Sequence, residues 1–81
     1  MKIEVYTKDN CTYCNQAKQL LKSKNLDYTE HYIAPSNRAV LLEELTTRLG
    51  VAPRTVPQIF IDDKSIGGYT ELAQWLKDNN K

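Results

Sequence analysis

The first 33 residues change from a strand pattern to a helix pattern and back, and this order limits the folds open to the chain. Residues 2–7 alternate apolar and polar side chains, which is typical of a half-buried strand. Apolar residues then recur at helical spacing over 12–25, and 26–33 has the composition of a second strand. Two strands joined by one helix lie parallel, with a right-handed crossover. We therefore expect a parallel β-α-β unit within an α/β sheet.

The following residues add a helix, a hairpin and a final helix. Residues 36–49 have helical spacing, with Ser36 as a suitable N-cap and Gly50 as a natural stop. Residues 58–67 form a hairpin of two short strands, and Thr70 is placed to cap the last helix. The side chains that the three helices are expected to bury are Tyr13, Ala17, Leu20, Leu21, Leu41, Leu42, Leu45, Leu49, Leu72, Ala73, Trp75 and Leu76. The order β-α-β-α-β-β-α predicts a four-stranded mixed sheet flanked by three helices.

The composition is that of one globular domain, which we place over residues 1–81. Apolar residues make up 41% and charged residues 26%, and no apolar run approaches the roughly 20 residues needed to span a bilayer. The first residues lack the apolar core and cleavage site of a secretory signal, so we expect a cytoplasmic protein. Eleven basic and ten acidic side chains leave a net charge of +1. This balance gives no reason to expect a nucleic acid or a membrane as partner.

The only two cysteines, Cys11 and Cys14, are three positions apart. A disulfide that closes so short a ring would stabilise the fold little. A structural zinc site needs four ligands, and the chain has one histidine, His31, and no second cysteine pair. We expect His31 to be a surface strand residue. Randomly placed cysteines would have this spacing only about 2% of the time, so a reactive dithiol is favoured.

The position of the cysteine pair predicts different roles for the two thiols. Cys11 lies just past the carboxyl end of the first strand, where open α/β sheets bind ligands. It also begins a helix, whose free N–H groups and dipole favour a thiolate, and Lys8 can add a cation. Cys14 lies one turn inside the helix and should be more buried. We therefore predict that Cys11 is the nucleophile and that Cys14 resolves the mixed disulfide formed on it.

The order and spacing of three segments resemble those of a known family. The segments are V-Y-T-K-D-N-C-T-Y-C, R-T-V-P-Q-I-F-I and I-G-G-Y-T-E-L-A-Q-W-L, and the family is the glutaredoxins. The likeness covers nearly the whole chain and is closest to small bacterial or phage-type dithiol glutaredoxins. It implies a thioredoxin-like fold, with glutathione as co-substrate and no resident metal. It also implies, as substrates, disulfide-containing or glutathionylated proteins, ribonucleotide reductase among them. We expect a monomer.

The resemblance also implies a glutathione site. Tyr13 occupies the aromatic position of the active-site motif, where its ring would flank glutathione, although the helical pattern equally allows a core aromatic. Thr55, Val56 and Pro57 resemble the family's T-V-P turn, in which the proline is cis and the Val56 backbone can pair with an extended thiol peptide. An ordinary loop proline is the alternative. The resemblance implies these glutathione-binding residues: Lys8, Tyr13, Arg54, Thr55, Val56, Pro57, Gly68, Tyr69, Thr70 and Glu71.

The two ends of glutathione would be held by different groups. N–H groups at the start of the last helix suit a carboxylate, and Glu71 could receive the α-amino group. Gly67 and Gly68 could equally be only a strand terminator and a cap. Lys8 and Arg54 would face the other carboxylate.

Thr12 departs from the family pattern, because the common dithiol motif has proline at that position. The substitution leaves the redox potential open and the reaction class unchanged. Two other functions also remain open. One is a redoxin of similar fold reduced by thioredoxin reductase, and the other is an iron–sulfur carrier in which Cys11 and a glutathione thiol hold a cluster between two subunits.

Overall fold

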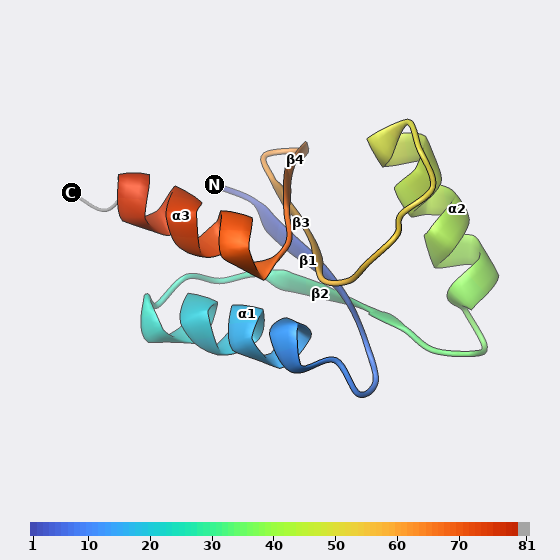
Figure 1. Cartoon of the computed structure of the whole chain (residues 1–81), viewed down its shortest axis with the longest axis horizontal. Coiled ribbons are helices and arrows are strands. Elements are labelled where there is room, and N and C mark those ends of the chain that lie inside the picture. The colour runs from blue at the N-terminus through green and yellow to red at the C-terminus, as the bar shows by residue number, and fades with distance from the viewer. Residues whose placement is uncertain (80–81) are drawn as a thin grey trace.

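A computed structural model, which describes residues 1–79, has strands and helices in the order expected from the sequence (Figure 1). The elements are β1 (Ile3–Lys8), α1 (Thr12–Ser23), β2 (Thr29–Ile33), α2 (Arg38–Leu49), β3 (Gln58–Ile61), β4 (Lys64–Gly67) and α3 (Tyr69–Asn79). The strand order is β2-β1-β3-β4, with β1 and β2 parallel and the other neighbours antiparallel. The predicted thioredoxin-like mixed sheet with three helices is confirmed. Within residues 1–79 no helix is both long and apolar enough to cross a membrane.

Helices cover both faces of the central strand β1. α1 and α3 lie together on one face, and α2 lies across the other (Figure 1). Residues 3–7 are therefore all buried, and the prediction of a half-buried strand is wrong. Ile3 and Val5 pack beneath α1 and α3, whereas Glu4 and Tyr6 face α2 because successive strand residues point to opposite faces.

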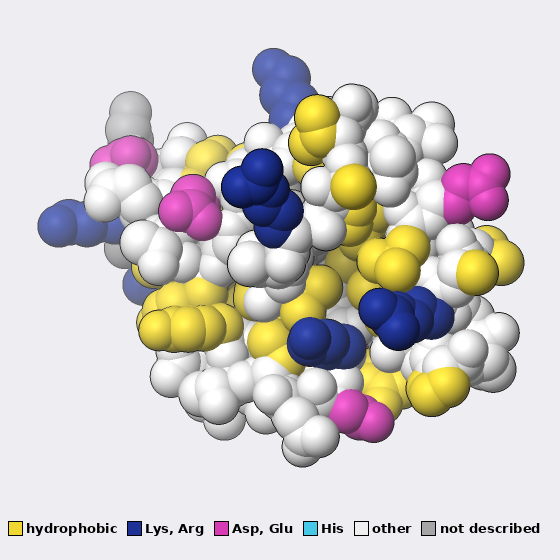
Figure 2. All heavy atoms as spheres, turned by 45° about the vertical axis from the view of Figure 1, so that its right-hand side comes forward, with side chains coloured by type: hydrophobic (Ala, Val, Ile, Leu, Met, Phe, Trp, Pro, Cys, Tyr) yellow, Lys and Arg dark blue, Asp and Glu magenta, His cyan; other side chains and the backbone are white. Residues whose placement is uncertain are grey.

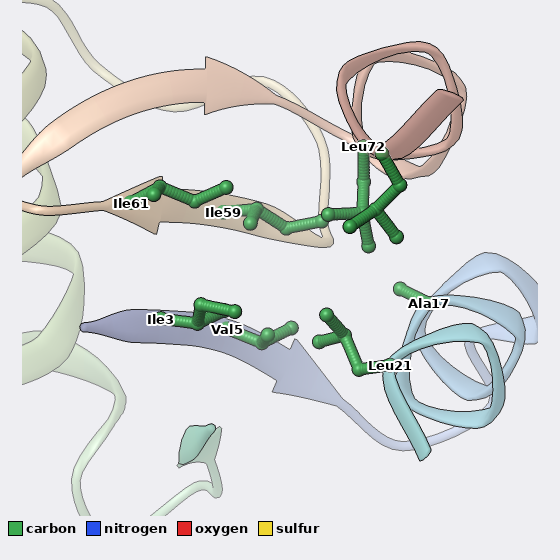
Figure 3. Close-up of a cluster of buried hydrophobic side chains, with 8 residues drawn as sticks. Ile3, Val5, Ala17, Leu21, Ile59, Ile61 and Leu72 are labelled. Atoms are coloured by element: carbon green, nitrogen blue, oxygen red, sulfur yellow. The ribbon is translucent and has the colours of Figure 1, made fainter. Parts of the chain in front are cut away.

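The larger hydrophobic cluster joins α1 and α3 to the sheet. Figure 3 shows side chains from β1 and β3 meeting side chains from both helices. The fully buried members are Ile3, Val5, Ala17, Leu21, Ile59, Ile61, Leu72 and Leu76. Burying one such aliphatic side chain contributes about 1.5–3 kcal/mol. Since Leu21 and Ala17 anchor α1, this cluster also fixes the start of that helix, where Cys11 lies.

The smaller cluster beneath α2 contains only Tyr6, Leu45 and Phe60 as fully buried members. An ion pair between Arg48 and Glu4 lies next to this cluster. Arg48 on α2 donates two hydrogen bonds, of 3.1 and 2.8 Å, to the two carboxylate oxygens of Glu4. Its guanidinium carbon lies 3.8 Å from the centre of the Phe60 ring. The bond to Arg48, opposed in part by burial, holds the pKa of Glu4 at about 2.

His31 lies on β2, as predicted, but it belongs to the same network, so its side chain is only partly exposed. Its Nε2 lies 3.1 Å from Glu4 Oε1, and its ring stacks on Tyr6 at 4.5 Å between centroids. The Tyr6 hydroxyl donates a 2.5 Å bond to Glu44, and burial raises the pKa of Tyr6 to about 12. Hydrogen bonds from Arg48 to Glu4 and from Tyr6 to Glu44 thus join α2 to β1.

Several predicted boundaries move by a few residues. α1 ends at Ser23 and Asn25 turns away with φ 57°, so β2 begins at Thr29 instead of residue 26. The N-cap of α2 is Asn37 and not Ser36, and the Asn37 side chain accepts a hydrogen bond from Ala34 N–H in the preceding turn and none from the helix. The helical residues predicted as core that are only partly buried are Leu20, Leu41, Leu42, Leu49, Ala73 and Trp75.

Candidate active site

Cys11 and Cys14 form a disulfide at the N-terminus of α1. Asn10, with φ 56°, turns the chain after β1, and Cys11 follows in an extended conformation as the helix N-cap. Its sulfur accepts a hydrogen bond of 3.2 Å from Cys14 N–H. Cys14 is 1% exposed, whereas Cys11 is partly exposed. The predicted difference in burial between the two sulfurs is confirmed.

The contact of the Cys11 sulfur with the start of α1 favours negative charge on it once the disulfide is reduced. The N–H of Cys14 lies in the first turn of α1 and points at this sulfur. A bond from N–H to an anion is stronger than one to a neutral sulfur, and the helix dipole acts in the same direction. Cys14 is enclosed by the protein and has no comparable access to solvent. The arrangement therefore suits nucleophilic attack by Cys11.

The Val56–Pro57 turn lies beside this sulfur. The peptide bond between the two residues is cis, as the resemblance implied. The Val56 carbonyl oxygen is 3.5 Å from Cys11 Sγ. A Cβ placed on Gly68 would come within 3.4 Å of the Pro57 carbonyl oxygen, so the start of α3 lies directly against the turn. Three segments far apart in the sequence thus meet at one end of the sheet.

A groove of about 230 Å³ lies where these three segments meet. We call it the aromatic groove. Its lining residues are Tyr13, Thr55, Val56, Pro57, Gly68, Tyr69, Thr70 and Glu71. The Tyr13 ring is 60% exposed and stacks on Tyr69, with 6.1 Å between centroids. The core alternative for Tyr13 is wrong, because the ring is largely exposed and borders the groove.

Glu71 caps α3 in addition to lining the aromatic groove. Its Oε1 accepts a 2.7 Å hydrogen bond from Gly68 N–H, so Gly68, and not Thr70, precedes the first turn of α3. This is the reach-back of a capping box. The side chain occupies the space beside Gly67, where a Cβ would lie 2.7 Å from Glu71 Cγ. Within residues 1–79 the other oxygen, Oε2, has no hydrogen-bond partner and stays open to a ligand in the groove.

A second groove, of about 180 Å³, adjoins the first and shares Thr55 and Val56 with it. We call it the cationic groove. Its lining residues are Lys8, Ile33, Arg38, Leu42, Pro53, Arg54, Thr55 and Val56. It contains the two predicted site residues that the aromatic groove lacks, Lys8 and Arg54. Arg38 was not predicted; the one signal in the sequence was a cation in the first helical turn, where acidic residues are preferred.

Thr12, the residue that departs from the family motif, is exposed at the first position of α1 and forms no side-chain hydrogen bond within residues 1–79. We expect Thr12→Pro to raise the free energy of unfolding by about 0.4–1 kcal/mol, because proline restricts the unfolded chain and fits the first helical position. Cys11 has φ −115° and ψ 100°, an extended conformation close to that favoured before proline. Urea unfolding of the oxidised protein measures the effect. Thr12→Ala is the control for the lost hydroxyl, and a destabilised proline variant would contradict the prediction.

Comparison with known proteins gives the family. The glutaredoxin family model matches residues 3–66. "Glutaredoxin 3" of Escherichia coli is 46% identical over 70 residues, covering 86% of this chain and 80% of that protein. The structure of glutaredoxin 1 from Francisella tularensis, complexed with cacodylate, has a TM-score of 0.77 and 39% identity over 99% of this chain and 98% of that one. A buckwheat glutaredoxin–glutathione complex has a TM-score of 0.80 and 28% identity, covering 95% and 69%. The chain belongs to the glutaredoxin family of thiol–disulfide oxidoreductases.

Proposed function

We propose that this thiol–disulfide oxidoreductase is glutathione-dependent and that it reduces protein disulfides and glutathione mixed disulfides. One observation carries the proposal. Eight of the ten residues that the resemblance implied for glutathione line the aromatic groove beside Cys11, and the other two line the adjoining cationic groove. The buckwheat relative, whose structure is a complex with glutathione, supports the same ligand.

With a glutathionylated protein, the Cys11 thiolate attacks the glutathione sulfur. The protein thiolate leaves and takes a proton from solvent, and a disulfide between Cys11 and glutathione forms. A second glutathione thiolate then attacks the glutathione sulfur of this mixed disulfide. Oxidised glutathione is released and the Cys11 thiolate is restored.

With a protein disulfide, Cys11 first forms a mixed disulfide with one substrate sulfur, and the other substrate sulfur leaves as a thiol. The Cys14 thiolate then attacks Cys11 Sγ and displaces the second substrate thiolate. The product is the disulfide between Cys11 and Cys14 that the structure contains. Two glutathione molecules reduce it, giving one molecule of oxidised glutathione.

The two grooves would hold glutathione in an extended form. The backbone of Val56, whose carbonyl oxygen lies beside the Cys11 sulfur, pairs with the peptide part of glutathione. N–H groups in the first turn of α3 bind the carboxylate of its glutamyl end, and Oε2 of Glu71 receives the α-amino group. Lys8 and Arg54 face the glycine carboxylate. Tyr13 covers the thiol end with its ring.

We further propose that the protein acts as a cytoplasmic monomer and that ribonucleotide reductase is among its protein substrates. The family likeness supports the reductase as a substrate, because this chain resembles the small bacterial glutaredoxins over most of its length.

Steady-state reduction of a glutathione mixed disulfide tests glutathione dependence. We expect turnover with glutathione and glutathione reductase, and at most about a hundredth of that rate with thioredoxin reductase alone, because the grooves fit a tripeptide thiol. Oxidation of NADPH measures the rate with each of the two electron donors. Equal rates with the two donors would contradict the proposal and favour a redoxin reduced by thioredoxin reductase.

A further inference from the structure

The cationic groove contains more positive charge than the fold uses. Lys8, Arg38 and Arg54 line it and no acidic residue does. Figure 2 shows Lys and Arg side chains gathered around a hollow whose surface is largely hydrophobic. Within residues 1–79 none of the three cations forms an ion pair, whereas Lys18 and Arg48 elsewhere each contact a carboxylate.

Arg38 in particular has no structural role that explains its charge. It is exposed at the first position of α2, whose first turn has no acidic residue. A cation near the positive end of a helix dipole is unfavourable, so the helix itself does not explain this arginine. Asp9, the acidic neighbour of Lys8 in sequence, lies close to Tyr32 instead, and its carboxylate raises the pKa of that hydroxyl. The charge of Arg38 is therefore unpaired within residues 1–79 and available to a ligand that enters the groove.

Glutathione would use only part of this charge. Beyond its cysteine it has one glycine, with one carboxylate, for which Lys8 and Arg54 suffice. Arg38 and the apolar wall of Ile33, Leu42 and Pro53 are then left for a longer chain. In a protein substrate, the residues after the reactive cysteine would continue along the path taken by the glycine.

We propose that the cationic groove binds an acidic segment of the protein substrate, with Asp or Glu in the positions after the reactive cysteine. Arg38 determines this specificity, and Ile33, Leu42 and Pro53 contact the aliphatic parts of the segment. The inference rests on the proposed function, because the substrate cysteine must first be joined to Cys11. Binding of the acidic segment selects among protein disulfides and adds no step to the reaction. An exposed charge pair of this kind changes kcat/KM by about threefold, and salt weakens it.

Two peptide substrates test the inference. Both are symmetric disulfide dimers, so Cys11 always bonds to the same peptide, and they differ only in having Asp-Glu or Asn-Gln after the cysteine. The readout is the acidic-to-neutral ratio of kcat/KM, followed through NADPH with glutathione and glutathione reductase. We expect a ratio of about 5–10 in the wild type at about 50 mM salt, and a clearly smaller ratio at about 300 mM.

Arg38→Gln is expected to lower this ratio about threefold. Lys64→Gln removes the same charge from an exposed position on β4, at the end of the sheet opposite Lys8, that forms no ion pair within residues 1–79. It should leave the ratio unchanged. A wild-type ratio near one, or equal ratios in the two variants, would overturn the inference and leave the proposed function standing. If the wild type reduces neither peptide with glutathione but does so with thioredoxin reductase, both are overturned.

Discussion

Cys11→Ser is expected to abolish glutathione-coupled disulfide reduction, with a fall in kcat/KM of at least about 10³-fold. Cys11 is the more exposed of the two cysteines, and its sulfur accepts the Cys14 N–H at the start of α1. A serine hydroxyl in the same place is not ionised at neutral pH and cannot form the mixed disulfide. Reduction of a glutathione mixed disulfide, with glutathione reductase and NADPH, measures the loss.

Cys14→Ser is the matched control, because it makes the same atomic change one helical turn away. Cys14 is 1% exposed and cannot meet a substrate before Cys11 does. This variant should keep reduction of glutathione mixed disulfides, in which a second glutathione resolves the intermediate, and should lose most of the reduction of protein disulfides. Activity retained by Cys11→Ser, or lost equally by both variants, would contradict the assigned roles.

The order of elements and the position of the cysteine pair could be predicted because both depend on local sequence. Alternation and helical spacing define the β-α-β unit, and a turn after β1 necessarily leads Cys11 to the start of α1. The segments containing Pro57 and Gly68 could be identified only through their likeness to a family. The structure adds that they meet beside Cys11, although binding of glutathione there remains a prediction.

The environment of α2 could not be predicted, because it depends on how that helix lies on the sheet. The alternation in β1 suggested a solvent-facing Glu4, yet α2 covers that face. Of the leucines expected to be buried by α2, only Leu45 is fully buried, and Arg48 fills the space over Phe60. Nothing local to Arg38 indicated that it would reach a groove shared with Lys8, since these residues belong to different elements.

Arg48→Met should lower the free energy of unfolding by about 3–5 kcal/mol at pH 7. The Glu4 side chain is 7% exposed and would keep only His31 and the mostly exposed Lys2 as partners. Methionine retains an apolar stem over Phe60, so the loss reports mainly an unpaired buried carboxylate. This is a large part of the roughly 5–15 kcal/mol that holds a small protein folded.

The pH dependence of this loss separates an unpaired carboxylate from poorer packing. Arg48 holds the pKa of Glu4 at about 2, below the ordinary 4.5. The ion pair therefore contributes fully above about pH 4.5, and its contribution falls as the pH drops towards 2. The difference between wild type and Arg48→Met should shrink as the pH falls towards 2, because a protonated Glu4 needs no cation. Urea unfolding at several pH values between about 3 and 7 measures this.

Two further variants make the test specific to the Glu4–Arg48 pair. Glu4→Gln combined with Arg48→Met removes the buried charge as well and should recover a substantial part of the lost stability. Arg38→Met removes from the same helix an exposed arginine that forms no ion pair in the described part of the chain, residues 1–79. It should change the free energy of unfolding by no more than about 0.5 kcal/mol. Two results would mean that α2 is held by its apolar contacts and not by the buried ion pair. One is a loss of unfolding free energy in Arg48→Met that is the same at every pH. The other is an equal loss in Arg38→Met.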